Sequence, residues 1–192
     1  IQDASGNSSS AIAVVTVEDN MDPTVITQDI AIQLDANGDA NISVSDIDDG
    51  SSDNCAIDTS SLDVSSFDCS DIGTNLVTLT VVDVNGNSAS ATAIVTVSET
   101  ENPVAVTQNV TVQLDANGVA SISADGIDNG SSDNCGIVSS SIDISTFGCD
   151  DIGDNTVVFT AEDGSGNTDS VNVTVTVEDN LTPTAIGQDI TV

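Results

Sequence analysis

The sequence predicts an all-β fold made of tandem immunoglobulin-like β-sandwich repeats of about 80 residues. Three observations predict it: long segments recur at a fixed interval, Val/Ile/Thr-rich runs alternate apolar and polar residues, and Asn/Gly turns separate those runs. Alternation with a period of two is typical of strands that bury one face. Several short strands divided by turn signals in a unit of this length are the pattern of an immunoglobulin-like sandwich.

The cysteines give the period of the repeat. Cys55 and Cys135 are 80 positions apart, and so are Cys69 and Cys149. The whole chain follows this register. It predicts the last two strands of a truncated repeat (1–20), two complete repeats (21–100 and 101–180) and the first strand of another (181–192). We therefore expect a piece of a longer array; the alternative is that the terminal strand of one subunit completes the open repeat of the next.

Comparison of the two copies indicates which residues face the core. In the strands on either side of the Asn/Gly turn, every second residue is apolar in both copies. Side chains at alternate positions of a strand share one face, so these residues are expected to be buried. They are Val77, Leu79, Val81, Ala93, Val95 and Val97 in the first copy and Val157, Phe159, Ala161, Val173, Val175 and Val177 in the second.

Turn signals mark the connections between these strands. The Asn/Gly turns at 83–87 and 163–167 are predicted to close hairpins, and 3–7 is the same turn in the truncated copy. No long helix is expected. One helical turn is predicted within 43–49, capped by Ser43 and ended by the glycine that follows.

The charge of the chain is extreme. It has no Lys, Arg or His and 32 acidic residues, which gives a formal net charge of −32. Repulsion between so many negative charges destabilises a compact fold. Such a chain is therefore expected to be disordered, to fold only in high salt, or to bind cations. The strand-like composition disfavours disorder, and the clumping of the carboxylates favours bound cations. Nucleic acid and anionic membrane surfaces are not expected partners because both require Lys or Arg, and no apolar run is long enough for membrane insertion.

The carboxylates are predicted to meet at the junctions between repeats. In an immunoglobulin-like sandwich, alternate loops lie at opposite poles, so the loops of one repeat approach the loops of the next. Oxygen ligands without His or thiolate suit Ca²⁺, of which several ions are expected in the array. The alternative for any single Asp is that it only holds its own turn. The predicted metal ligands are Glu18, Asp19, Asn20, Asp22, Asp35, Asp39, Asp46, Asp48, Asp49, Asp53, Asp71, Asp83, Glu99, Glu101, Asp125, Asp128, Asp133, Asp163, Glu178 and Asp179.

The cysteines are predicted to form a disulfide within each repeat, Cys55 with Cys69 and Cys135 with Cys149. The two positions are 14 residues apart in each copy, and no His accompanies them. A zinc site would need four ligands brought together from two repeats, which is the less favoured alternative. Disulfides imply an oxidising setting outside the cell, so an extracellular or cell-surface location is expected.

Several segments resemble the HYR-like, immunoglobulin-fold repeats of very large secreted or surface proteins of Bacteroidetes: QLDANG.A.I, DNGSSDNCGI, F.C..IG.NTV.FT..D.SGN and VTVEDN..P. The resemblance covers the whole chain and implies a stalk or adhesin that is exported to the cell surface. The linker also resembles the calcium-binding junction of cadherins. That likeness implies ligands at 18–20 and 178–180, including Asn180, whereas the middle linker departs from it with Ser98, Glu99 and Thr100.

The predicted function is structural: an extracellular stalk, adhesin extender or filament that calcium makes rigid at its junctions. Its expected partners are the neighbouring repeats and other copies in a filament. The alternative is an adhesin module that binds a surface or glycan, although three Phe without Trp or Tyr offer few aromatic contacts. An enzyme is not expected, because the same carboxylates recur in every repeat and no His, Lys or Tyr offers a base or nucleophile.

Overall fold

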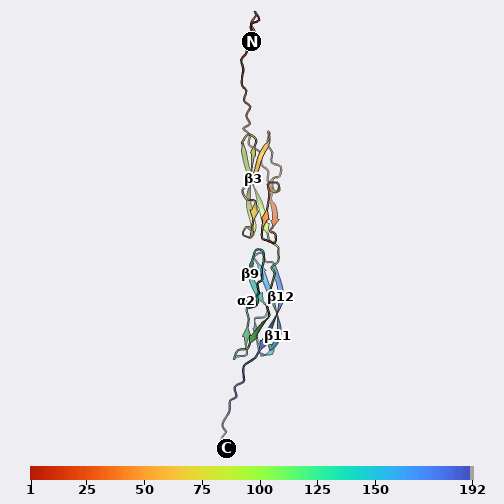
Figure 1. Cartoon of the computed structure of the whole chain (residues 1–192), viewed down its shortest axis with the longest axis vertical. Coiled ribbons are helices and arrows are strands. Elements are labelled where there is room, and N and C mark those ends of the chain that lie inside the picture. The colour runs from red at the N-terminus through yellow and green to blue at the C-terminus, as the bar shows by residue number, and fades with distance from the viewer. Residues whose placement is uncertain (191–192) are drawn as a thin grey trace. The chain divides into compact units, whose positions relative to one another are not determined.

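The structure is a computed structural model that describes residues 1–190. It contains two copies of one arrangement of elements (Figure 1). The first copy has β1 (Ile30–Gln33), β2 (Ala40–Asn41), α1 (Val44–Ile47), β3 (Ile57–Leu62), β4 (Ser66–Phe67), the 3-10 helix η1 (Cys69–Asp71), β5 (Gly73–Asp83) and β6 (Ser88–Ser98). The second has β7 (Val110–Gln113), β8 (Ala120–Ser121), α2 (Ala124–Ile127), β9 (Ile137–Ile142), β10 (Thr146–Phe147), η2 (Cys149–Asp151), β11 (Gly153–Asp163) and β12 (Thr168–Glu178).

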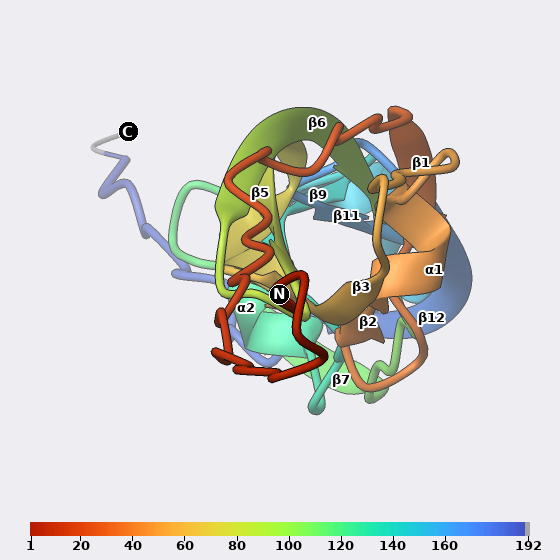
Figure 2. The ribbon, with the colours of Figure 1, turned by 90° about the horizontal axis from the view of Figure 1, so that it is seen from above.

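Each copy is built from a four-stranded and a two-stranded sheet. The strand orders are β1-β6-β5-β3 with β2-β4 in the first copy, and β7-β12-β11-β9 with β10-β8 in the second. In the second copy β12 pairs antiparallel with β11 and parallel with β7. Figure 1 shows α2 beside β9, and Figure 2 shows α1 beside β3. The all-β, immunoglobulin-like sandwich class is confirmed.

The predicted inward face of the long hairpins is confirmed. All twelve side chains assigned to the core from the comparison of the copies are at most 2% exposed, whereas Leu76 on the opposite face is 68% exposed. The two-stranded sheets add Phe67 and Phe147, each 3% exposed. Burying a side chain of this size contributes about 1.5–3 kcal/mol, so these few large residues carry much of each core.

The predicted turns are also present. Asp83 Oδ1 accepts hydrogen bonds from the backbone N–H groups of Asn85 and Asn87, both at 2.8 Å, in the turn that joins β5 to β6. Asp163 holds the β11–β12 turn in the same way. Ser43 is the N-cap residue of α1, as expected. The Ser43 backbone N–H donates to Asp46 Oδ2 at 2.7 Å.

The terminal segments are less regular than the repeats. The predicted turn at 3–7 forms, with a bridge between Gln2 and Ser8. No strand of the described chain pairs with residues 11–20, and Ile12 is 96% exposed. Residues 181–190 form no strand, and the rest of the strand expected there lies outside the described residues. No helix in the described part of the chain is long and apolar enough to cross a bilayer.

The described chain forms two compact units, and their border crosses the first repeat. One unit comprises Ile1–Ile30, Ile42–Ser65 and Thr74–Thr96. The other comprises Ala31–Asn41, Ser66–Gly73 and the chain from Val97 onward. The segment that links the two repeats therefore lies inside this second unit, together with the segments 31–41 and 66–73 of the first repeat.

Candidate metal centre

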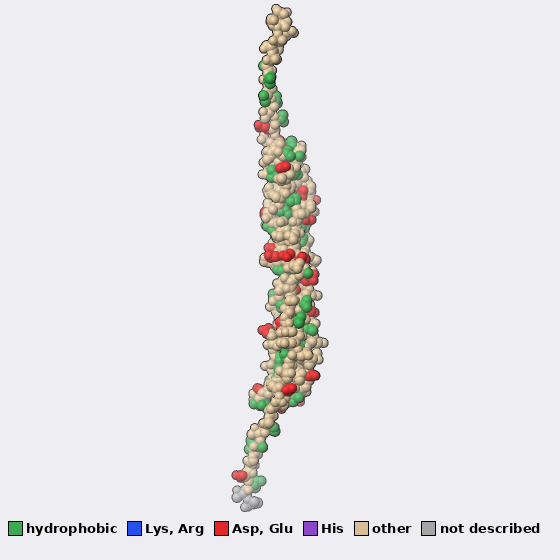
Figure 3. All heavy atoms as spheres, viewed as in Figure 1, with side chains coloured by type: hydrophobic (Ala, Val, Ile, Leu, Met, Phe, Trp, Pro, Cys, Tyr) green, Lys and Arg blue, Asp and Glu red, His purple; other side chains and the backbone are tan. Residues whose placement is uncertain are grey.

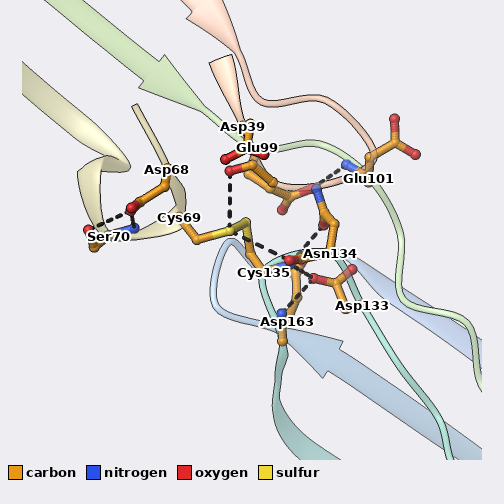
Figure 4. The surroundings of a disulfide bond; sticks show 12 residues. Asp39, Asp68, Cys69, Ser70, Glu99, Glu101, Asp133, Asn134, Cys135 and Asp163 are labelled. Atoms are coloured by element: carbon orange, nitrogen blue, oxygen red, sulfur yellow. Dashed lines mark hydrogen bonds between the residues drawn. A yellow bond between two sulfur atoms is a disulfide. The ribbon is translucent and has the colours of Figure 1, made fainter. Parts of the chain in front are cut away.

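Two buried carboxylates lie side by side where the second repeat begins. Glu99 follows β6 and is 5% exposed, and Asp163 ends β11 and is 2% exposed. The two side chains share a hydrogen bond. The Asn167 side-chain amide donates to both, to Glu99 Oε2 at 2.9 Å and to Asp163 Oδ2 at 2.8 Å. The Glu101 backbone N–H donates to Glu99 Oε1, so the linker itself holds the Glu99 carboxylate in place (Figure 4).

The two carboxyl groups differ in their preference for a proton. Burial raises the pKa of Glu99, and its hydrogen bond with Asp163 raises the pKa further. Burial also acts to raise the pKa of Asp163, but the hydrogen bonds from Asn167, Glu99 and Ser165 together outweigh it, so this pKa is lowered. Of the two carboxyl groups, Glu99 is therefore the one that more readily holds a proton, because two adjacent carboxylates do not both ionise easily.

A third carboxylate near the disulfide has an unsatisfied oxygen. Asp133 Oδ2 accepts the backbone N–H groups of Cys135 at 2.8 Å and Gly136 at 3.0 Å. Its other oxygen, Oδ1, is buried without any hydrogen-bond partner. A buried acceptor left unpaired costs on the order of 1–3 kcal/mol. Since the chain has no basic side chain, only the N-terminus or a bound cation offers positive charge, and these oxygens fit a hard cation such as Ca²⁺.

The first repeat carries an equivalent group of side chains 80 positions earlier. Asp19, Asp53 and Cys55 bring their ligand atoms within 4.8 Å of one another. Asp83, the equivalent of Asp163, is 1% exposed. Asn87 donates to Asp83 Oδ2 at 2.7 Å and to the Asp19 carbonyl oxygen at 3.1 Å. The buried Asp and its Asn therefore recur at the start of both repeats, but Asn87 donates to the Asp19 backbone and Asn167 to the Glu99 side chain.

The thiol of Cys55 offers a test of this first group. The hydrogen bond to the Asp19 carboxylate raises the pKa of Cys55, and neighbouring carboxylates add to the effect. The thiolate is the reactive form, so Asp19→Asn is expected to speed the alkylation of Cys55 by iodoacetamide at pH 8. Peptide mass spectrometry after timed alkylation measures it. Cys149, which is also free, is the internal reference; equal acceleration at both cysteines contradicts the prediction.

The disulfide differs from the sequence prediction. Cys69 bonds to Cys135, 66 positions away, with a Cα–Cα distance of 5.4 Å, and Cys55 and Cys149 are free and exposed. The prediction of a disulfide within each repeat was therefore wrong. The bond instead joins the η1 loop of the first repeat to the loop before β9 of the second (Figure 4).

The physical reason is the length of β5. Cys69 lies in η1, just before β5 begins, whereas Cys55 lies just before β3, whose Ile57 pairs with Asp83 at the far end of β5. Eleven residues of strand span about 35 Å. A disulfide requires Cα atoms within about 7 Å, so the two cysteines of one repeat cannot meet.

The junction between the repeats has further contacts around the disulfide. The Asn134 side-chain amide donates to the Asp35 carbonyl oxygen at 2.9 Å. Gly38 has a φ of +81°, and a Cβ there would lie 2.7 Å from Cys69 Sγ, so only glycine fits the turn at this point. Figure 4 shows Asp39, Asp68 and Asp133 in these surroundings, with the Glu101 carboxylate pointing away from the disulfide.

Many predicted ligands instead hold their own loops. Hydrogen bonds from the Asn37 and Asp39 amides lower the pKa of Asp35, and Asp128 accepts from Ser131 in the same way. Asp46, Asp48, Asp71, Glu178 and Asp179 also accept hydrogen bonds from residues of their own repeat or linker. Other predicted ligands are exposed on the surface, which carries acidic side chains along its length (Figure 3): Glu18, Asn20, Asp22, Asp39, Asp49, Glu101 and Asp125.

Sequence reasoning missed the asparagines of the site. Asn167 donates to both buried carboxylates, and Asn87 occupies the equivalent place in the first repeat. Asn134 connects the two repeats. Each stands at a matching position in both copies, and that recurrence was the available signal.

Comparisons with known proteins give only distant likenesses. No protein-family model and no curated protein matches the sequence. Among solved structures, extracellular cadherin domains 1–4 of protocadherin gamma B7 match with 11% identity and a TM-score of 0.40 over 84% of this chain and 52% of that one. The chain thus spans about half the length of that structure.

Two shorter structures match as well. Cadherin domains 1–2 of human mucin-like protocadherin share 9% identity and a TM-score of 0.39, over 82% of this chain and 98% of that one. The N-terminal Ig1-2 module of the Drosophila receptor protein tyrosine phosphatase DLAR shares 9% identity and a TM-score of 0.27, over 82% and 100%. The assignment as an immunoglobulin-like sandwich rests on the chain's own strand order and register.

Proposed function

We propose that this chain is part of an extracellular structural array whose junctions bind calcium and thereby hold consecutive repeats in a fixed arrangement. The observation that carries the proposal is the buried pair Glu99 and Asp163, which share a hydrogen bond in a chain without Lys, Arg or His. Burying a second negative charge beside the first is unfavourable unless a cation compensates it.

The residues that would hold the ion at this junction are Glu99 and Asp163, with the unpaired Oδ1 of Asp133 beside the disulfide. All are oxygen ligands, as Ca²⁺ prefers, and Cys135 is already bonded to Cys69 and offers no thiolate. The ion would supply positive charge, and the chain already places the Glu99 carboxylate of the linker against the Asp163 carboxylate of the second repeat. Asp19, Asp53 and Asp83 would form the equivalent site.

The structural role follows from where these ligands lie in the chain. Glu99 belongs to the linker, whereas Asp163 ends β11 and Asp133 lies in the loop before β9 of the second repeat. An ion bound to all three would fix the linker against the repeat that follows it. The Cys69–Cys135 disulfide supports an oxidising, extracellular setting for such an array.

The test is a calcium titration of the full chain. Isothermal calorimetry and thermal unfolding are measured in Ca²⁺, in Mg²⁺ and in chelator. We expect heat of binding for Ca²⁺ and a higher unfolding temperature; a ligand at 100 times its Kd adds about 2.7 kcal/mol. Small-angle scattering reports whether the repeats become fixed. Identical calorimetric and unfolding traces in Ca²⁺ and chelator would overturn calcium binding, and binding without any change in scattering would overturn the structural role.

A further inference from the structure

The two free cysteines are the repeat equivalents of the two bonded ones. Cys149 stands 80 positions after Cys69, and Cys55 stands 80 positions before Cys135. The bond between Cys69 and Cys135 joins a loop of one repeat to a loop of the next. Cys149 therefore stands at the position that Cys69 has in its repeat, and Cys55 at the position that Cys135 has in its repeat.

The surroundings of Cys149 match those of Cys69. Cys69 Sγ lies 3.8 Å from the Gly38 carbonyl oxygen, and Cys149 Sγ lies 3.9 Å from the Gly118 carbonyl oxygen. A Cβ on Gly118 would come within 2.8 Å of Cys149 Sγ, as one on Gly38 would come within 2.7 Å of Cys69 Sγ. Around Gly38, however, Asn134 and Cys135 of the next repeat also lie within 4 Å, whereas around Gly118 only Cys149 does.

The surroundings of Cys55 match those of Cys135. The Cys55 backbone N–H donates to Asp53 Oδ2 at 2.7 Å, and that of Cys135 donates to Asp133 Oδ2 at 2.8 Å. Asn54 precedes Cys55 as Asn134 precedes Cys135. The loop around Cys55 thus has the same backbone contact as the loop around Cys135, and Cys55 is exposed.

A small cavity shows the same contrast at the end of the second repeat. Ala36 lines a cavity with Asp133 and Asn134 of the next repeat. Its equivalent Ala116 lines a cavity with Asp115, Asp179 and Pro183, and no loop residue that matches Asp133 or Asn134 takes part.

We propose that Cys149 forms a disulfide with Cys55 of another repeat of this kind, here a second copy of this chain, as Cys69 does with Cys135. In this contact the Asn54 side-chain amide would donate to the Asp115 carbonyl oxygen of the preceding repeat, as Asn134 does to Asp35. The inference rests on the repeat symmetry of the sulfurs and does not depend on calcium binding.

The reaction uses a small-molecule disulfide such as oxidised glutathione as the oxidant. The Cys149 thiolate attacks one glutathione sulfur, which forms a mixed disulfide and releases one glutathione. The Cys55 thiolate of the other repeat then attacks the Cys149 sulfur and releases the second glutathione. Two cysteine thiols are oxidised, one glutathione disulfide is reduced, and the two protons end on the released glutathione thiols.

The test joins two copies in the register of the repeat, with residues 1–180 followed directly by 21–192. This junction continues the period of 80, so Cys149 of the first copy faces Cys55 of the second. The joined chain has eight cysteines, four from each copy. After refolding in reduced and oxidised glutathione, free thiols are counted by alkylation in denaturant, and disulfides are mapped by mass spectrometry after cleavage at acidic residues.

We expect two free thiols, on the first Cys55 and the last Cys149, and a mapped Cys149–Cys55 peptide pair. Cys149→Ser in the first copy is expected to raise the count to three without disturbing the Cys69–Cys135 pairs. Four free thiols, with Cys149 and the second Cys55 both alkylated, would overturn the proposal. No free thiols, with pairs inside each repeat, would overturn both the proposal and the pairing on which it rests.

Discussion

Cys69→Ser is expected to lower the free energy of unfolding by about 4 kcal/mol. The Cys69–Cys135 disulfide closes a loop of 66 positions, and removing such a constraint frees the unfolded chain by about this amount in the chain-entropy model. The effect should be large in this protein because its cores contain few aromatic side chains, with only three Phe in the chain. Urea unfolding followed by circular dichroism, without reductant, measures it.

The matched control for this variant is Cys149→Ser. Cys149 is the repeat equivalent of Cys69, is exposed and forms no disulfide in this chain, so its replacement should change stability by no more than about 0.5 kcal/mol. In strong reductant the wild type and Cys69→Ser should unfold alike. Equal stability of the two chains under oxidising conditions, or an equal loss in both serine variants, would contradict the prediction.

Glu99→Gln is expected to remove most of the stabilisation that calcium gives at the junction. At 100 times its Kd an ion adds about 2.7 kcal/mol, and the substitution deletes a charged ligand from the buried pair. In chelator at pH 7 the same substitution should stabilise the chain, because a neutral amide replaces a carboxyl group whose ionisation is opposed by burial and by Asp163.

The pH dependence separates these two effects. The pKa of Glu99 is raised in the folded state, so the folded chain keeps a proton that the unfolded chain has lost. Its contribution to stability is fully present below the ordinary pKa of Glu and is lost as the pH rises through the raised value. In chelator, the stability of the wild type relative to Glu99→Gln should therefore fall as the pH rises above the ordinary pKa of Glu.

The control is Glu162→Gln, which removes the same charge from an exposed position of β11. This variant should keep the calcium response. Thermal unfolding of the three chains across pH, with calcium and with chelator, gives all the comparisons. A flat difference between the wild type and Glu99→Gln in chelator would contradict the role assigned to the buried pair.

The fold could be predicted well because the repeat period and the alternation of apolar and polar residues determine which face of each strand is buried. Val77 and Phe159 could be assigned to the core from their spacing alone, since neighbouring positions of a strand must face opposite sides. The disulfide could not be predicted this way. The period shows that Cys55 and Cys135 are equivalent, but which cysteines meet depends on the length of β5 and on contacts between consecutive repeats.

The candidate site was predictable only in part, for a related reason. Asp35 and Asp163 both stand in Asp/Asn/Gly turns and look alike in the sequence. In the structure Asp35 holds an exposed turn, whereas Asp163 is buried against Glu99. That difference arises because the Glu99 side chain of the linker packs against Asp163, which is a tertiary contact that no local pattern encodes.

The Cys69–Cys135 bond also changes how the chain would carry a pulling force. Between these cysteines lie β5, β6, β7, β8 and α2, and tension along the backbone would pass through the sulfur atoms and leave those elements unloaded. The 66 positions that the bond spans correspond to about 230 Å of extended chain, which stays hidden until the bond is reduced. The redox state of one bond therefore sets how far this part of the chain can be stretched.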